Sequence, residues 1–217
     1  LGNEKIAPII YTEKGKSKGI AVDLAKELGQ KIGYRVVVNA VNWEIAQNKV
    51  LAEEADALLQ INPNSEREKL YDFSDELLKS EFSIFIKRGN SIKNLNDLKY
   101  KTVGVEERGY PHYLLQKYEE IKITRISDWA TGFQMLQSGT LDAIVVDRWV
   151  GEYELAHSKV KDVQVVEEPI ETHYSRIAVN KGNTKLLNLI NAGLKELNED
   201  GTMANIIRNW KGKQVVY

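Results

Sequence analysis

The fold is decided by a stretch that reads WATGFQMLQSGTLDAIVVD and runs from Trp129 to Asp147. Apolar residues recur at helical spacing in its first half, and Ala143–Val146 is an apolar run of strand length. An earlier stretch, WEIAQNKVLAEEADALLQI, has the same plan and runs from Trp43 to Ile61. In each copy a Trp opens a predicted helix and precedes an Asp-Ala pair by the same number of residues. The repeated unit predicts two lobes, each with its own parallel sheet.

Helical and strand patterns also alternate along the rest of the chain, as in α/β proteins whose strands are covered by helices. A helical stripe over Ala21–Ile32 ends at Gly33, which suits a left-handed cap, and the valine-rich segment Arg35–Val41 predicts a strand. The C-terminal part predicts two helices, Lys185–Leu197 and Met203–Trp210. The alternative to two lobes is that the Trp-to-Asp spacings coincide by chance in ordinary α/β sequence.

The composition is that of a globular protein and excludes several classes. Of 217 residues, 42% are hydrophobic and 28% charged, and 30 Lys and Arg against 31 Asp and Glu give a net charge of −1. The apolar share excludes intrinsic disorder, and the charge balance removes the electrostatic argument for a nucleic-acid or anionic-membrane partner. No apolar run approaches the ~18–20 residues of a membrane helix. The chain has no cysteine, which excludes disulfides and thiolate chemistry.

Motifs for catalysis and metal binding are not found in the sequence. Gly15–Ser17 is similar to the end of a phosphate-binding loop, but Ile10 stands where that loop needs its first glycine. His112, His157 and His173 are scattered without metal-ligand spacing, and no Gly-x-Ser-x-Gly nucleophile turn occurs. We therefore expect no enzymatic activity, no cofactor and no metal site.

Two charged residues follow the two matching strands, at the strand ends where open α/β sheets bind ligands. Arg67 comes after Ala57–Ile61, within Ser65–Glu68, which has the form of a capping box. A guanidinium beside free helix N–H groups binds carboxylates or phosphates; alternatively, Arg67 pairs with a neighbouring glutamate on a solvated face. Asp147 can accept hydrogen bonds from a ligand ammonium group; alternatively, it caps a helix or pairs with Arg148.

A series of motifs covers nearly the whole chain: Gly19-Ile20-Ala21-Val22-Asp23-Leu24, Asp56-Ala57-Leu58, Arg67 with Asp72-Phe73-Ser74-Asp75, Leu141–Asp147, and Ile177–Asn183 through Asp200-Gly201-Thr202 to Trp210. Together and in this order they resemble the family 3 extracellular solute-binding proteins, the polar amino-acid receptors of bacterial ABC importers. The segment Leu59–Pro63 with Ser65–Arg67 is most similar to the version that serves as the extracytoplasmic sensor of membrane histidine kinases and diguanylate cyclases.

The resemblance implies the type II periplasmic-binding-protein fold. This is an α/β fold with two lobes, two parallel-type sheets with helices on both faces, and two crossings of the chain between the lobes. Lobe one would comprise 1–86 plus 178–217, and lobe two 87–177. Hinges near Ile86–Asn90 and Arg176–Val179 would let the lobes close on a ligand.

The resemblance also implies binding roles for individual residues. Arg67 matches the arginine that clamps the ligand α-carboxylate, and Asp147 matches the aspartate that receives the α-ammonium. Trp43 matches an aromatic that packs on the ligand side chain, although a Trp at the start of an amphipathic helix also suits the core. Asn62 stands where the family usually has a Ser or Thr for the carboxylate. Gln60 stands where a backbone carbonyl often meets the ammonium.

One turn in lobe two departs from the family pattern. The family has Gly followed by Thr or Ser there, whose hydroxyl and N–H groups hold the carboxylate, whereas this chain has Glu106–Pro111. Tyr110 offers the nearest hydroxyl and is therefore included among the ligand-binding residues, and Pro111 favours a helix start. An α-amino acid is the leading ligand, and another carboxylate or an amine is the alternative.

We therefore expect an extracytoplasmic domain, periplasmic or on the cell surface, that closes on a small amino-acid-like solute. Its leading assignment is the sensor domain of a transmembrane histidine kinase, tethered to the membrane through the kinase. The first alternative is the amino-acid receptor of an ABC importer, with a permease as partner. The second is an enzyme similar to cyclohexadienyl dehydratase, for which Glu106, Glu107 or Glu171 would be the general acid.

Overall fold

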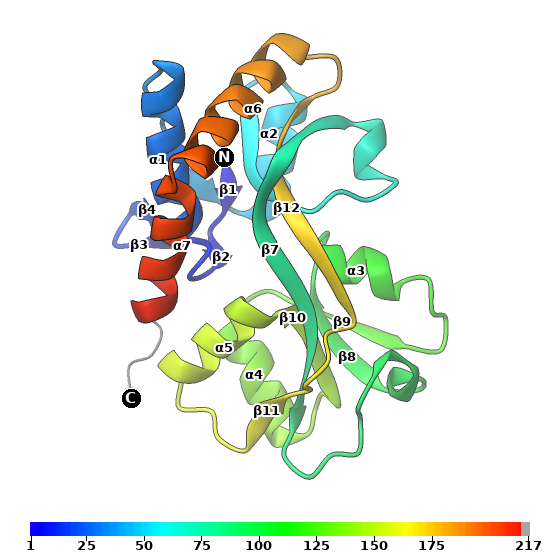
Figure 1. The fold of residues 1–217 in the computed structure, drawn as a ribbon. Coiled ribbons are helices and arrows are strands. Elements are labelled where there is room, and N and C mark those ends of the chain that lie inside the picture. Colours follow the sequence, from blue (N-terminus) through cyan, green and yellow to red (C-terminus); the bar gives the residue numbers. More distant parts are fainter. Residues whose placement is uncertain (214–217) are drawn as a thin grey trace. The chain divides into compact units, whose positions relative to one another are not determined.

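The structure, a computed structural model, describes residues 1–213 and divides into two compact units (Figure 1). Unit 1 contains Leu1–Leu78 and the chain from Tyr174 onward, and unit 2 contains Lys79–His173. The chain passes between the units within two long strands, β7 (Tyr71–Lys87) and β12 (Glu171–Asn180). The expected α/β class is confirmed. The expected lobe limits and hinge positions stay predictions.

Unit 1 combines short strands of both orientations. β1 pairs in parallel with β5, β2, β3 and β4 form an antiparallel sheet, and β6 pairs antiparallel with β12. The bounds of these strands are β1 Gly2–Asn3, β2 Lys5–Ile6, β3 Ile10–Glu13, β4 Lys16–Lys18, β5 Ala40–Val41 and β6 Ala57–Ile61. The end of β6 is the strand end from which the chain continues to Arg67.

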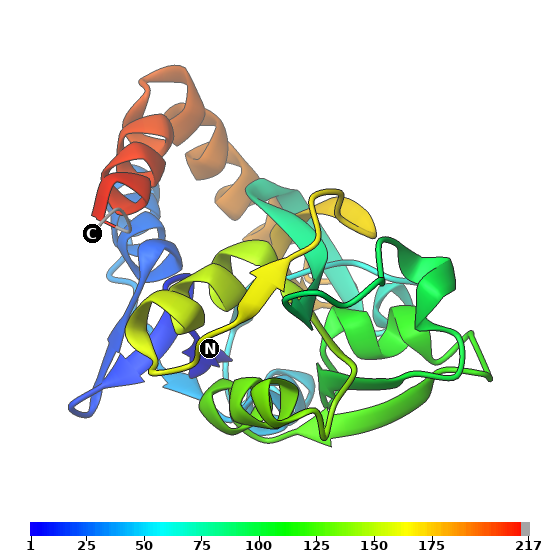
Figure 2. The ribbon, with the colours of Figure 1, turned by 90° about the horizontal axis from the view of Figure 1, so that it is seen from below.

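Three helices of unit 1 pack against one another, as both views of the ribbon show (Figures 1 and 2). They are α1 (Ile20–Ile32), α6 (Thr184–Glu199) and α7 (Thr202–Lys213). The backbones of α1 and α6 approach closely because Gly193 has no side chain: a Cβ there would lie 2.5 Å from the Cδ1 of Leu28. The two predicted C-terminal helices are thus present, each slightly longer than expected.

The predicted strand Arg35–Val41 is wrong for all but its last two residues. Only Ala40 and Val41 pair, with β1, and the preceding residues have no regular structure. Val37, within this segment, is 66% exposed, so its side chain lies largely in solvent. Valine content favours a strand only where a pleated, half-buried surface receives the side chains.

Unit 2 is built on a sheet in which β10 pairs in parallel with β8, and β8 in parallel with β9. β7 pairs antiparallel with both β10 and β11, so the sheet is mixed rather than all parallel. The reason is that β7 enters from unit 1 and runs opposite to the strands of the helix–strand units. The bounds are β8 Thr102–Glu106, β9 Lys122–Ile126, β10 Ala143–Asp147, β11 Val163–Val165, α3 Tyr110–Leu115, α4 Trp129–Ser138 and α5 Arg148–His157.

The repeated helix–strand unit read from the sequence is present once in each unit. Trp43 is the first residue of α2 (Trp43–Leu51), which leads to β6, and Trp129 is the first residue of α4, which leads to β10. Both helices begin after a side-chain cap, from Asn42 and Asp128 respectively. Two strand ends, those of β6 and β10, therefore have equivalent places in their own units.

Gly19 precedes α1 with a φ of 123°, and a Cβ there would lie 2.3 Å from the backbone oxygen of Ile9. We expect Gly19→Ala to lower the free energy of unfolding by at least about 2 kcal/mol, because backbone strain and a clash with a fixed carbonyl add. Urea unfolding measures this. Gly212→Ala is the control, since nothing lies within 4 Å of a Cβ at that position. Equal stability of the two variants would contradict the prediction.

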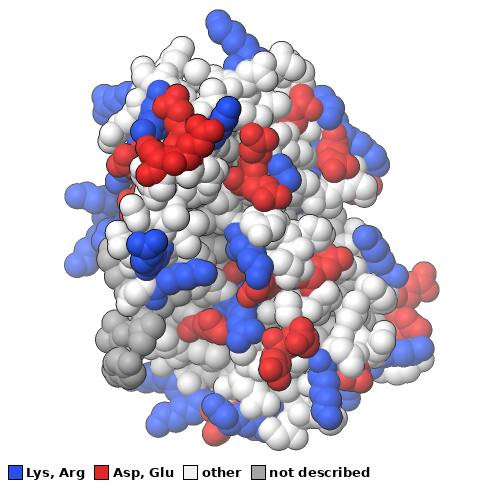
Figure 3. Space-filling view, in the orientation of Figure 1, with Lys and Arg blue, Asp and Glu red and all other residues white. Residues whose placement is uncertain are grey.

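Acidic and basic side chains are interspersed over the face of the molecule in Figure 3. This distribution matches the net charge of −1 and gives that face no broad area of one sign. Within residues 1–213, no helix combines the length and the apolar character needed to cross a bilayer.

Candidate functional site

The loop after β6 in unit 1 places Arg67 at the start of a single 3-10 turn, Arg67–Lys69. Arg67 is only 3% exposed, and its Nη1 donates a 2.7 Å hydrogen bond to the backbone oxygen of Asn62. Its backbone N–H donates to Oδ1 of Asn64 at 2.8 Å. The alternative that Arg67 lies on a solvated face is wrong, because it is buried and Glu66 pairs with Lys69. A buried guanidinium is thus held at the carboxyl end of β6.

The expected capping box at Ser65 is also wrong, because the N–H of Glu68 donates to the backbone oxygen of Asn64 and the turn has no side-chain cap. Asn64 Oδ1 accepts the hydrogen bond of the Arg67 N–H. We expect Asn64→Ala to lower the free energy of unfolding by about 1 kcal/mol, the typical net contribution of one hydrogen bond, and to weaken ligand binding by displacing Arg67. Ser65→Ala is the control, since Ser65 is exposed. Thermal unfolding and calorimetry measure the two effects. A larger loss of unfolding free energy in Ser65→Ala than in Asn64→Ala would contradict this prediction and support the capping box.

Trp43 is part of the core of unit 1, which confirms the structural alternative for this residue. It is 7% exposed and lies in a cluster with Ala46, Val50 and Tyr71. The guanidinium carbon of Arg67 also lies 5.8 Å from the centre of the Trp43 ring, within the range of a cation–π contact. Trp43 therefore supports Arg67 from the core side, and a contact with the ligand remains a proposal.

Gln60 and Asn62 lie on the segment that leads from β6 to Arg67. Both are buried, at 7% and 6% exposed. The backbone oxygen of Asn62 is the acceptor that holds the Arg67 guanidinium. Within unit 1, Arg67 thus contacts both Trp43 and Asn62. Gln60 lies on β6, two positions before Asn62 in the sequence.

Asp147 ends β10 in unit 2 and is 9% exposed. Its Oδ1 accepts a hydrogen bond from the backbone N–H of Trp149 at 2.9 Å, which confirms the helix-cap alternative, for α5. The alternative pair with Arg148 is not formed: Arg148 donates to Glu152 at 2.8 Å. Burial raises the pKa of Asp147 to about 7, against the hydrogen bonds from Trp149 and Ser80, which lower it. This carboxyl group is therefore poised to ionise near neutral pH.

Tyr110 is the first residue of α3 and is half-buried. Its ring stacks on Phe82 at 4.7 Å between ring centres. Its hydroxyl lies 2.8 Å from Glu171 Oε2 and 2.8 Å from His173 Nε2. Phe82 is in turn the residue opposite Asp147 in the β7–β10 pairing. Tyr110 and Asp147 therefore lie at the same edge of the unit 2 sheet.

The sequence interpretation missed Phe82 and His173 and considered Glu171 only as a candidate acid. The available signal was the spacing of Glu171 and His173, which puts their side chains on one face of a strand. Glu106 and Glu107, the other candidate acids, lie at the end of β8 and just after it, and Glu107 pairs with Arg125.

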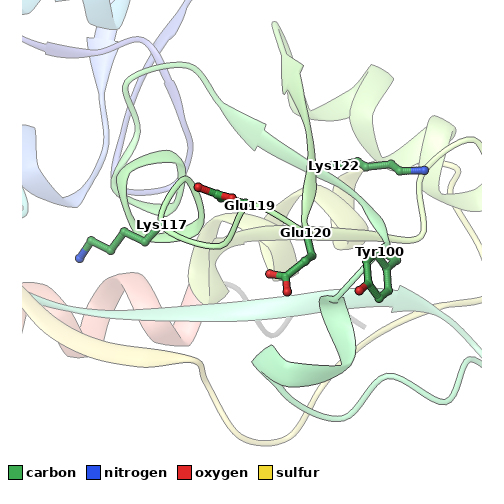
Figure 4. A pocket seen from close by; sticks show the side chains of 5 residues that line it. All are labelled: Tyr100, Lys117, Glu119, Glu120 and Lys122. Atoms are coloured by element: carbon green, nitrogen blue, oxygen red, sulfur yellow. The ribbon is translucent and has the colours of Figure 1, made fainter.

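A separate hollow of about 600 Å³ in unit 2 is lined by Tyr100, Lys117, Glu119, Glu120 and Lys122. Figure 4 shows the amino ends of Lys117 and Lys122 pointing away from each other. Ligand pockets are mostly apolar with a few converging polar groups, and this hollow has neither property. None of the candidate site residues lines it. Among the residues that the structure describes, no group of three or more His, Cys, Asp or Glu is arranged to hold a metal ion.

Comparison with known families decides the class of the protein. The family described as bacterial extracellular solute-binding proteins, family 3, matches residues 2–213. The chain belongs to this family. A curated relative is the L-cystine-binding protein TcyJ of Escherichia coli K12, 30% identical over 207 residues, covering 94% of this chain and 77% of the relative. Membership makes the chain a solute-binding protein of an extracellular or periplasmic family whose relatives bind amino acids.

Two solved structures show the same fold for this family 3 protein. An ancestral arginine-binding protein bound to arginine has a TM-score of 0.88 and 31% identity, with 96% of each chain covered. A histidine kinase sensor domain with similarity to periplasmic binding proteins has a TM-score of 0.90 and 23% identity, with 96% of this chain and 93% of the other covered. The periplasmic-binding-protein fold expected from the sequence is thereby confirmed.

Proposed function

We propose that this chain is an extracytoplasmic receptor domain that binds an α-amino acid through Arg67 and Asp147. The observation that carries the proposal is that the equivalent strands β6 and β10 are followed by opposite charges, and that both charged side chains are buried. A free α-amino acid carries one carboxylate and one ammonium group. The amino-acid-binding relatives support this class of ligand.

In this proposal Arg67 binds the α-carboxylate, because a guanidinium can donate two hydrogen bonds to the two carboxylate oxygens. Asp147 accepts hydrogen bonds from the α-ammonium. Asn62 adds a polar contact to the carboxylate, and the backbone carbonyl of Gln60 meets the ammonium. Trp43 packs against the ligand side chain, and Tyr110 offers a hydroxyl group. Losing one partner of a buried charge pair typically costs about 2–5 kcal/mol, so Arg67 and Asp147 would supply most of the affinity.

We propose that ligand binding triggers signalling, with this chain as the sensor domain of a transmembrane histidine kinase. The similarity of Leu59–Pro63 and Ser65–Arg67 to such sensors supports it. A second candidate is the receptor of an ABC importer, which the relative TcyJ supports. The full-length protein in membranes separates the two. Ligand-dependent autophosphorylation is the result expected of a sensor, and ligand uptake through a permease is that of an importer receptor.

A binding screen tests the ligand class. Thermal shift assays would cover the L-amino acids, their D-enantiomers, dicarboxylates and polyamines, followed by isothermal titration calorimetry. We expect an L-amino acid to bind, and a ligand at 100 times its Kd adds about 2.7 kcal/mol to the free energy of unfolding. Binding of none of the amino acids would contradict the proposal. Turnover of prephenate or arogenate would instead favour the dehydratase alternative.

A further inference from the structure

Three side chains of unit 2 form a closed hydrogen-bonded triangle, which we name the Tyr–Glu–His cluster: Tyr110, Glu171 and His173. The Tyr110 hydroxyl lies 2.8 Å from Glu171 Oε2 and 2.8 Å from His173 Nε2, and the last two atoms are 2.9 Å apart. Glu171 and His173 alternate along β12, so both side chains leave the strand on one face. Polar groups from two distant segments thus converge on one point.

The Tyr–Glu–His cluster lies at the sheet edge that also carries Asp147. β8 and β10 are parallel neighbours, so the loop after β8, which leads to Tyr110, and the residue that ends β10 share that edge. Phe82 links the two places, because its ring stacks on Tyr110 and its backbone lies opposite Asp147. A ligand held at Asp147 therefore has this cluster as a neighbour within the same unit.

The hydrogen bonds of the cluster leave Glu171 with unused acceptor capacity. Tyr110, and His173 when it carries its proton on Nε2, both donate to the same oxygen, Oε2. The Glu171 side chain is 37% exposed, and its ion-pair contact is with His173; within residues 1–213 no lysine or arginine pairs with it. A carboxylate has about four lone-pair sites, so hydrogen bonds to one oxygen leave it able to accept more. The group that complements it is a cation.

We propose that the Tyr–Glu–His cluster is the subsite for the distal end of the ligand, and that it selects an amino acid whose side chain ends in a cation. This inference rests on the proposed function, in which Arg67 and Asp147 use the α-carboxylate and the α-ammonium. Glu171 is then the carboxylate that remains for a second positive charge. A neutral side chain would cover that carboxylate without a positive charge to offset its lost hydration, and an acidic side chain would be repelled.

Arginine and citrulline test the inference, because the two have nearly the same shape and differ in the charge of the side-chain end. We expect calorimetry to give wild-type protein an affinity for arginine at least about tenfold above that for citrulline. In Glu171→Gln the affinity for arginine should fall by about tenfold or more, while that for citrulline changes by less than about threefold. Glu168→Gln, at an exposed glutamate of the same unit, is the control and should change neither.

The outcomes distinguish this inference from the proposed function. Citrulline binding as tightly as arginine, equal losses for both ligands in Glu171→Gln, or binding of neutral amino acids alone would overturn the inference and leave the amino-acid receptor in place. Binding of no amino acid would overturn both. The ratio of the arginine and citrulline affinities is measured on the wild-type protein, so the inference is tested even where Glu171→Gln is unstable.

Discussion

Arg67→Ala is expected to abolish measurable amino-acid binding while unit 1 stays folded. The variant removes the group proposed to bind the α-carboxylate, and the loss of about 2–5 kcal/mol corresponds to at least about a 30-fold weaker affinity. Some stability is lost as well, because Arg67 donates to Asn62 and lies against the Trp43 ring. Calorimetry with the best ligand of the screen measures the affinity, and thermal unfolding measures the fold.

Arg208→Ala is the matched control for Arg67→Ala. Arg208 is an exposed arginine of the same unit, and its Nη1 lies 3.2 Å from Oδ1 of Asn205 on the same helix. We expect this variant to bind like the wild type. Unchanged affinity in Arg67→Ala would contradict the proposed site, whatever the control shows.

Asp147→Asn is expected to lose most of the binding and yet to gain stability at alkaline pH. Burial raises the folded-state pKa of Asp147 from 3.8 to about 7. A raised carboxyl pKa means that the folded state keeps a proton that the unfolded state releases between these two values. The proton on Asp147 therefore adds to the free energy of unfolding. This contribution is complete at low pH, is lost as the pH rises towards 7, and amounts to about 4 kcal/mol at most. Asparagine can still accept from Trp149 and carries no charge.

Urea unfolding of both proteins at pH 4, 7 and 8.5 tests the stability effect of Asp147→Asn. The free energy of unfolding of the wild type should fall relative to that of the variant between pH 4 and pH 7, and parallel profiles would contradict the assignment. Binding has the opposite dependence, because the ligand ammonium needs the ionised carboxylate. Below about pH 7, affinity of the wild type should fall by up to about tenfold for each pH unit.

The sequence predicted the parts of this fold that depend on local patterns. The two helix–strand units that begin at Trp43 and Trp129 are present because each helix has its own cap and each strand its own apolar run. The strand expected over Arg35–Val41 failed because a strand also needs a neighbour, and sequence alone does not supply the position of that neighbour. Propensity predicts an element only as far as packing agrees with it.

The candidate site could also be predicted only in part. Arg67 and Asp147 could be found because each follows a strand end, a position that the order of elements fixes. The hydrogen bond from the Arg67 N–H to Asn64 was missed because Ser65 offered a more familiar pattern. The Tyr–Glu–His cluster was missed because 61 residues separate Tyr110 from Glu171, and only the pairing of distant strands brings them together.

The most direct test of the account combines truncated ligands with truncated side chains. Calorimetry would compare the bound amino acid, the amine that lacks its carboxylate and the acid that lacks its amino group, against wild type, Arg67→Ala and Asp147→Asn. We predict that Arg67→Ala weakens the amino acid and the acid but leaves the amine unchanged, whereas Asp147→Asn weakens the amino acid and the amine but leaves the acid unchanged. Equal losses for all three ligands in both variants, or no losses, would contradict the assignment of Arg67 to the carboxylate and Asp147 to the ammonium.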